Sequence, residues 1–344
     1  MQSHASRYNA SEHLKDRHPD LTEPFPDGVI PDEIAWAYGR RAVPKLCANL
    51  ALEVLVSDKR ALALRVLLGL LTTQEQKGQA IASGACVSLV TLMEEPTPEV
   101  RWLSADVLCA LSMLLNGRLA MIAAGAVEKL TEHLLDENMR VRESCTAALA
   151  QFSKPNDGAQ ATMSSPAGVV RALVVLIDDE TTTMKAHFHA VSTLCHVNVT
   201  DRGIVQSLEA QAVPAVLKLA TNPETDEEAM GKCSHCLLLL CQHPDGRVVV
   251  LEEGGLPVLT NLMDCGEDCQ VAATAGLMGL TVEVDAKVAA IREAGPRLVE
   301  LLSEANPDVA ENALMTIRGA CEHPEAFKLA IELMSEDEKN LVFN

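Results

Sequence analysis

One short phrase recurs seven times along this chain of 344 residues, and it constrains the fold more than any other feature. The phrase starts at an anchor residue, continues with small or apolar residues, and ends in Leu-Val-x-Leu or a close variant. The anchors are spaced by 41 or 43 residues and are Arg41, Gly84, Gly125, Gly168, Gln211, Gly254 and Gly295. A period of this length indicates a repeat array, in which each unit buries its apolar face only by stacking on its neighbours.

The residues of the phrase predict a turn followed by a helix. Glycine at the anchor accepts a positive φ, so the chain can turn sharply there. Pro44, Pro214 and Pro257 then fall in the first turn of the next helix, where the missing N–H has no partner to lose. The apolar residues five and eight positions after the anchor share one helical face.

A second pattern lies between the anchors. Polar links, such as residues 94–98 and 222–226, precede apolar-periodic segments of 10 to 14 residues, and a short third segment follows a turn that contains Gly or Asp. The long segments are residues 100–111, 141–152, 184–197 and 271–280, and the turns are residues 116–118, 157–158, 201–203 and 245–247. Three helices in about 42 residues is the armadillo period, with two-helix HEAT repeats as the near alternative. The chain is expected to be all-α, an armadillo-type right-handed α-solenoid of about seven three-helix repeats.

Composition supports this fold class and limits the partners. Hydrophobic residues make up 48% of the chain but aromatic residues only 3%, which favours helices packed through aliphatic side chains. The net charge of −20 disfavours nucleic acid and anionic membrane surfaces. The eleven cysteines are odd in number and lie mostly in apolar segments, so they indicate buried free thiols in a reducing compartment.

The chain divides into two expected regions. Residues 1–31 are polar and form an extension that is flexible or is ordered by partners, and residues 32–344 form the solenoid. The first 20 residues have no apolar core of a signal peptide. The apolar segment 61–71 is interrupted by Arg65 and is shorter than the roughly 20 residues of a membrane span, so no membrane association is expected.

No catalytic or metal site is expected. Cys233, His235, Cys236, Cys241 and His243 offer ligands that zinc accepts, but they lie on one predicted helix, and no second Cys-x2-Cys pair accompanies them.

A cysteine–histidine nucleophile is also not expected. His187, His189 and His196 share one segment with Cys195, but neighbours along one helix point to different faces. Cys265 and Cys269 can at most pair with each other and are expected to be ordinary buried thiols. No phosphate-binding loop or dinucleotide motif occurs, so we expect no enzyme activity, no cofactor and no small-molecule substrate.

The long helices carry the candidate partner-binding residues. In armadillo import receptors this helix lines the concave face and carries Trp and, four residues later, Asn, which together clamp an extended basic peptide. None of the fourteen aligned positions here is Trp or Asn, so that clamp is not expected. Small residues instead admit a helix or an extended segment of another protein, although packing or solvation explains them equally well. The candidates, called the ladder below, are Arg65, Asp106, Ala147, Gln151, Ser192, His196, His235, Ala275 and Met315.

Two stretches resemble one particular family. Residues 38–46 read Tyr-Gly-Arg-Arg-Ala-Val-Pro-Lys-Leu, which is similar to the Tyr-Gly-x-Arg-Ala-x-Pro-Lys-Leu segment that opens the first repeat of the armadillo-repeat radial spoke proteins of motile cilia and flagella. Residues 154–160, Lys-Pro-Asn-Asp-Gly-Ala-Gln, are similar to a Pro-Lys-Gly-Ala-Gln turn in that family. The resemblance implies a non-enzymatic structural subunit of the axoneme whose partners are other radial spoke subunits. The alternative is a soluble armadillo adaptor or co-chaperone that regulates a partner protein.

Overall fold

The computed structural model describes residues 41–50 and 57–343. These residues contain 21 α-helices, one 3-10 helix and no strand, so the all-α class is confirmed. The chain divides into two compact units, residues 1–169 and 170–344, which are described separately. The expected extension 1–31 and the first residues of the radial-spoke-like segment, 38–40, lie outside the described residues.

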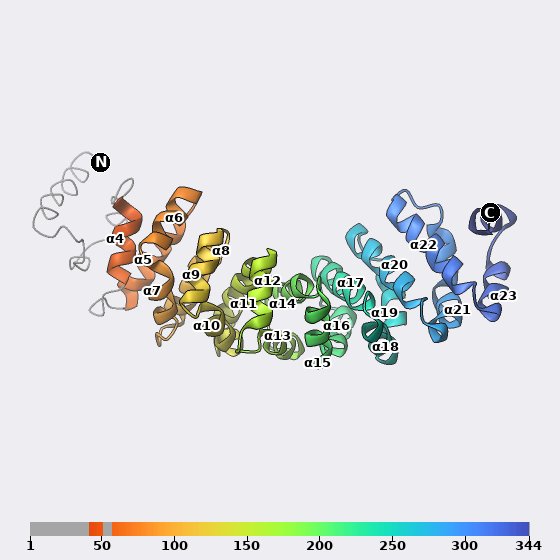
Figure 1. Ribbon diagram of the computed structural model, residues 1–344, viewed down its shortest axis with the longest axis horizontal. Coiled ribbons are helices and arrows are strands. Elements are labelled where there is room, and N and C mark those ends of the chain that lie inside the picture. The colour runs from red at the N-terminus through yellow and green to blue at the C-terminus, as the bar shows by residue number, and fades with distance from the viewer. Residues whose placement is uncertain (1–40, 51–56, 344) are drawn as a thin grey trace, which may run out of the picture. The chain divides into compact units, whose positions relative to one another are not determined.

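The helices of each unit follow one another in groups of three (Figure 1). The helices of the first unit are α4 (Ala42–Leu50), α5 (Ser57–Leu70), α6 (Gln74–Ala82), α7 (Ala85–Leu92), α8 (Pro98–Ser112), α9 (Leu115–Ala123), α10 (Ala126–Glu132), the 3-10 helix η2 (His133–Leu135), α11 (Met139–Ser153) and α12 (Asn156–Ser164). The helices of the second unit are α13 (Val169–Asp178), α14 (Met184–Val197), α15 (Asp201–Glu209), α16 (Ala212–Thr221), α17 (Glu227–Cys241), α18 (Pro244–Glu252), α19 (Gly255–Leu262), α20 (Glu267–Leu280), α21 (Val284–Leu301), α22 (Pro307–Ala320), α23 (Pro324–Leu333) and α24 (Glu336–Phe343).

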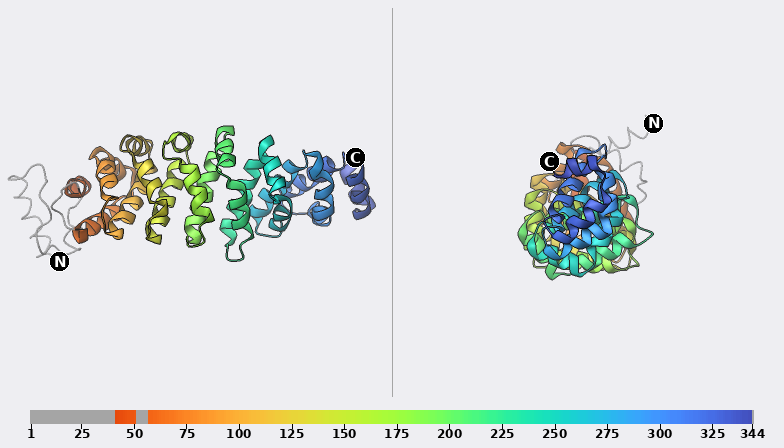
Figure 2. Two further views of the ribbon diagram at one scale, coloured as in Figure 1. Left: turned by 90° about the horizontal axis from the view of Figure 1, so that it is seen from below. Right: turned by 90° about the vertical axis from the view of Figure 1, so that its right-hand side faces the viewer.

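The long helices of neighbouring repeats pack directly on one another. In the first unit α8 contacts both α5 and α11, and in the second α17 contacts α14 and α20, while α20 also contacts α22. Within each unit the helix groups are stacked in chain order (Figure 2). Each repeat therefore buries its apolar face on its neighbours, as the period predicts.

Five of the seven anchors make the predicted turn. The backbone φ is positive at these five, and they are Gly84 (76°), Gly125 (71°), Gly168 (65°), Gln211 (60°) and Gly254 (78°). The apolar residues five and eight positions later are buried as expected; Leu89 and Leu92, after Gly84, are 0% and 3% exposed. Pro44, Pro214 and Pro257 each occupy the third position of their helix.

The other two anchors differ from the prediction. Arg41 is not among the described residues with positive φ, and Gly295 lies inside α21, which continues as one helix through Pro296. The glycine at 295 is explained by packing instead, because a Cβ there would lie 2.7 Å from Cδ1 of Leu333.

A second set of glycines lies inside helices rather than in the expected turns. Gly117, Gly158, Gly203 and Gly246 occupy the first turn of the short helices α9, α12, α15 and α18. A Cβ at any of them would lie 1.7 to 2.0 Å from a carbonyl oxygen near the end of the preceding long helix, that of Phe152 in the case of Gly158. Glycine is required because the short helix contacts the backbone of the long one.

The core is aliphatic, and Phe152 is the one aromatic residue among its largest fully buried side chains. Of the helices in the described ranges, none is by itself long and apolar enough to cross a membrane. Only when the bent pair of helices 156–164 and 169–178 is taken together do its length and apolar composition match those of a membrane span.

Candidate interaction surface on the long helices

The ladder residues occupy two positions, four residues apart, on the seven long helices, and most are accessible. Arg65, His235 and Met315 are exposed, and five others are partly exposed. Ser192 is the exception at 6% exposure, and its hydroxyl donates a hydrogen bond of 2.7 Å to the carbonyl oxygen of Phe188. The partly exposed residues are Asp106, Ala147, Gln151, His196 and Ala275. Partner binding by the ladder remains a prediction.

In the first unit, a cluster of Trp102, Asp106, Arg140 and Glu143 surrounds the ladder position on α8. The guanidinium of Arg140 lies 5.2 Å from the centre of the Trp102 ring and 3.6 Å from the carboxylate of Asp106. It also donates a hydrogen bond of 3.0 Å to Glu143. Burial raises the pKa of Asp106. This Trp102 cluster offers a partner an aromatic ring, a half-exposed cation and carboxylates, contributed by the adjacent helices α8 and α11.

In the second unit, Phe188 lies four residues before Ser192, as Trp102 lies four residues before Asp106. The ammonium of Lys232 on α17 lies 5.9 Å from the centre of the Phe188 ring. Both units therefore present a cation over an aromatic ring one helical turn before a ladder position. The sequence prediction missed these pairs because it compared the ladder positions alone, although the scarcity of aromatic residues makes the two rings conspicuous.

Cys195 on α14 lies against the neighbouring long helix α17, where its thiol donates a hydrogen bond of 3.6 Å to the carbonyl oxygen of Lys232. Hydrogen bonding with Cys236 on α17 is the main cause that lowers the pKa of Cys195, and His235 adds to it against the opposing effect of burial. The same contact raises the pKa of His235.

The sequence argument compared Cys195 only with the histidines of its own helix, so it did not consider His235 on the next long helix. Residues about one period apart on successive long helices meet across the repeat boundary, and this spacing was the signal available in the sequence.

The cysteines and histidines of α17 do not gather around a common point. In the two described ranges, no group of three or more His, Cys, Asp or Glu residues is placed to hold a metal ion. Cys233 and Cys241 are buried, and burial raises the pKa of Cys241 to about 12. His243 caps α18, because its Nδ1 accepts a hydrogen bond of 3.3 Å from the N–H of Asp245.

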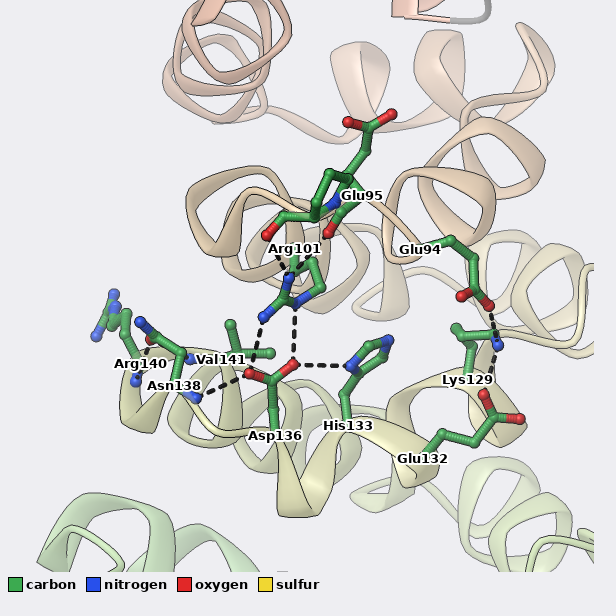
Figure 3. A network of polar contacts seen from close by, with 11 residues as sticks. Glu94, Glu95, Arg101, Lys129, Glu132, His133, Asp136, Asn138, Arg140 and Val141 are labelled. Atoms are coloured by element: carbon green, nitrogen blue, oxygen red, sulfur yellow. Dashed lines mark hydrogen bonds and ion pairs between the residues drawn. The ribbon is translucent and has the colours of Figure 1, made fainter. Parts of the chain in front are cut away.

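The polar links are held by ion pairs between neighbouring repeats. Arg101 donates two hydrogen bonds of 2.9 Å to Asp136, whose carboxylate also contacts Nδ1 of His133 at 3.0 Å (Figure 3). Nearby, Lys129 pairs with both Glu94 and Glu132 (Figure 3). These carboxylates already have basic partners, so their local role is structural.

Comparisons with known proteins agree with this architecture. A family model described as the plant U-box protein ARM repeat region matches residues 121–281. Junction plakoglobin from Homo sapiens is 25% identical over 248 residues, which cover 68% of this chain and 32% of that protein. U-box domain-containing protein 19 from Arabidopsis thaliana is 22% identical over 212 residues, covering 59% of this chain and 31% of that protein. The chain thus spans about a third of the length of these relatives.

Solved structures extend the likeness to nearly the whole chain. An engineered protein superposes with a TM-score of 0.76 at 23% identity, covering 94% of this chain and 78% of that one. A designed armadillo repeat protein in complex with the peptide (KR)4 superposes with a TM-score of 0.62 at 23% identity, covering 69% of this chain and 99% of that one. The chain therefore has the all-α solenoid fold of the armadillo-repeat proteins.

Proposed function

We propose that this chain is a non-enzymatic structural subunit of the radial spoke in the axoneme of motile cilia and flagella. The observation that carries the proposal is the pair of stretches at residues 38–46 and 154–160, which resemble those of the armadillo-repeat radial spoke proteins. Residues 42–46 belong to α4; residues 154 and 155 join α11 to α12, and residues 156–160 begin α12. At this joint Gly158 admits the close approach of the two helices.

The armadillo fold supports a binding role because it presents long rows of side chains on successive helices. In this chain the ladder and the Trp102 cluster supply such a row. The partners are other spoke subunits, which contribute a helix or an extended segment that lies across successive long helices. No nucleic acid, membrane or small molecule is required for this role.

Crosslinking mass spectrometry on native axonemes tests the proposal directly. We expect the protein to sediment with the axoneme, to leave it only in strong salt or chaotrope, and to crosslink to other spoke subunits. A freely cytosolic pool without an axonemal fraction would refute the proposal. Co-purification of Hsp70-type chaperones from that pool would support the alternative, a soluble adaptor or co-chaperone.

A surface variant tests whether the ladder makes the contact. Arg65→Glu, His235→Glu and Met315→Arg together change the three exposed ladder residues. We expect the triple variant to keep its helical circular dichroism and to lose axonemal binding about tenfold or more. Arg171→Glu on α13 is the control, since it changes an exposed residue off the ladder and shifts the net charge equally. Equal binding by the two variants would exclude the ladder as the interface.

A further inference from the structure

We propose that an exposed apolar face of α9, with Lys77 at its edge, docks an amphipathic helix of a partner protein. Apolar side chains of this helix pack on α9, and one of its carboxylates pairs with Lys77. The surface lies on a short helix, apart from the ladder on the long helices, and the proposal does not depend on the radial spoke role. The residues of this surface, called the α9 face below, are Met113, Leu115, Leu119 and Ile122.

The α9 face is apolar and open to solvent. Leu115, Leu119 and Ile122 are 54%, 53% and 44% exposed, and their spacing of four and three residues places them in one stripe. Met113, two residues before the helix, is 56% exposed. α9 carries no acidic residue, and its one basic residue, Arg118, is buried. A stripe of this spacing fits the apolar stripe of a second helix.

The fold does not require apolar residues at these places. In α9, α12 and α15 the third residue is glycine, so the three short helices align without gaps. The first residue is Leu115 in α9, but Asn156 in α12 and Asp201 in α15. The ninth residue is Ala123 in α9, but Glu209 in α15. Equivalent short helices thus keep polar side chains where α9 is apolar.

Lys77 is a nearly buried cation without a counter-charge. It is 8% exposed, and its Nζ lies 2.9 Å from Sδ of Met113, at the edge of the α9 face. Among residues 41–50 and 57–343, no carboxylate forms an ion pair with this ammonium. A thioether is only a weak acceptor, so Met113 does not replace a carboxylate.

The same place is basic in three later helices, and there the cation does have a carboxylate. Lys77 is the fourth residue of α6, and the fourth residues of α9, α18 and α21 each pair with the following repeat. Glu322 lies two residues before α23, as Met113 lies two residues before α9, so Met113 takes the place of a carboxylate. The three pairs are Arg118–Asp157, Arg247–Glu283 and Lys287–Glu322.

The missing counter-charge and the α9 face together select the occupant. A helix that covers the face also removes water from Lys77, so it binds well only if it brings a carboxylate to the ammonium. An amphipathic helix with an apolar stripe and one Asp or Glu at its edge supplies both. A second copy of this chain, bound face to face, would bring a second Lys77 in place of a carboxylate.

The test is selection on the full chain from a displayed library of helical peptides of about five turns. The peptides have a fixed leucine stripe and random residues at its edges. We expect the selected peptides to share Asp or Glu at one edge position, and its change to Gln should weaken binding about tenfold or more. Absence of binders, or selection without such a carboxylate, would overturn the proposal.

Leu119→Glu tests the apolar contact and should weaken peptide binding about a hundredfold. The matched control is Val248→Glu in α18, because Leu119 and Val248 are each the fifth residue of their helix and are 53% and 45% exposed. Equal weakening by the two variants would overturn the proposal. A dimer of the wild-type chain in sedimentation that Leu119→Glu dissociates would assign the face to a second copy and overturn it as well.

Lys77→Met tests the charge. Its loss of affinity and the loss from Gln in the peptide should not add, because both changes remove the same ion pair. Met113→Glu supplies a counter-charge within the chain and should weaken peptide binding about tenfold. Additive losses would show that the peptide carboxylate binds elsewhere, which would overturn the proposal.

Urea titration without peptide tests whether Lys77 lacks a partner inside the chain. Lys77→Met removes a nearly buried charge and should raise the urea midpoint. The control is Lys287→Met, which removes an equally buried lysine that pairs with Glu322 and should not raise the midpoint. A lower midpoint for Lys77→Met would show that the ammonium is already satisfied, and the proposal would fall.

Discussion

The guanidinium of Arg118 holds the carboxylate of Asp157 through two hydrogen bonds, of 2.7 and 2.9 Å. A third hydrogen bond, of 3.0 Å, joins Arg118 to the carbonyl oxygen of Ser112 at the end of the preceding long helix. In the second unit Arg247 donates one hydrogen bond of 2.7 Å to Glu283 and one of 3.4 Å to the carbonyl oxygen of Cys241. In each case one arginine thus links the long helix of its own repeat to the repeat that follows.

The Arg101–Asp136 pair should contribute more to stability than an exposed pair. The two side chains are only 14% and 6% exposed, so Asp136→Ala leaves a nearly buried guanidinium without its counter-charge. We expect the free energy of unfolding to fall by about 3 kcal/mol in urea titrations. The control is Asp178→Ala, whose carboxylate is 63% exposed beside Lys218 and should contribute less than about 1 kcal/mol. Equal losses would mean that burial does not set the strength of these pairs.

The same pair predicts a loss of stability in acid. Although burial raises the pKa of Asp136, hydrogen bonds from Arg101, the N–H of Asn138 and His133 outweigh it and lower the pKa. A carboxyl whose pKa is lowered by folding stabilises the protein above its ordinary pKa, and that contribution disappears as the pH falls through the lower, folded value. Titration of the unfolding free energy from about pH 6 to about pH 3 should show wild type and Asp136→Ala converging. A constant gap over this range would contradict the assignment.

Gly158 should tolerate no side chain. A Cβ there would lie 1.7 Å from the carbonyl oxygen of Phe152, so Gly158→Ala must push α12 away from α11. We expect a loss of about 3 kcal/mol or more in unfolding free energy, as for overpacking against fixed backbone. The control is Gly78→Ala in α6, where a Cβ meets nothing within 4 Å. That variant should be more stable by about 0.5–1 kcal/mol, because alanine favours a helix.

Gln211 should be improved by glycine. It is the one described residue other than glycine with a positive φ, 60°, and this left-handed conformation is unfavourable for a residue with a Cβ. Gln211→Gly should therefore raise the melting temperature, with a gain of up to about 1 kcal/mol. The reverse exchange at the equivalent anchor, Gly254→Ala, should lower stability by a similar amount, since φ there is 78°. A destabilised Gln211→Gly would show that side-chain contacts of Gln211 outweigh its backbone strain.

The sequence predicts the periodic part of the fold well. Anchor turns, helix order and the apolar face all follow from local rules that repeat, so Gly84 and Leu89 behave as expected. The exception at Gly295 shows the limit of such rules. There the glycine serves a contact with Leu333 of a later helix, which the phrase itself does not encode.

The candidate sites are harder to predict because they are formed between repeats. The neighbours of Cys195 and His235 on their own helices do not reveal how these two residues lie relative to each other, because that depends on how α14 packs against α17. Similarly, Trp102 gains its cation only from Arg140 at the start of α11. To predict contacts of this kind, the exact register between neighbouring helices must be known. The repeat period fixes that register only to within one helical turn.

The basic residues that join one repeat to the next have a mechanical consequence. Arg118 reaches Asp157 and Arg247 reaches Glu283, and each link ends at the adjoining repeat. Under tension, each unit should therefore yield from one end, one repeat at a time, so that force–extension curves show a series of small, similar drops. A chain built in this way would absorb strain gradually and recover when the load is removed.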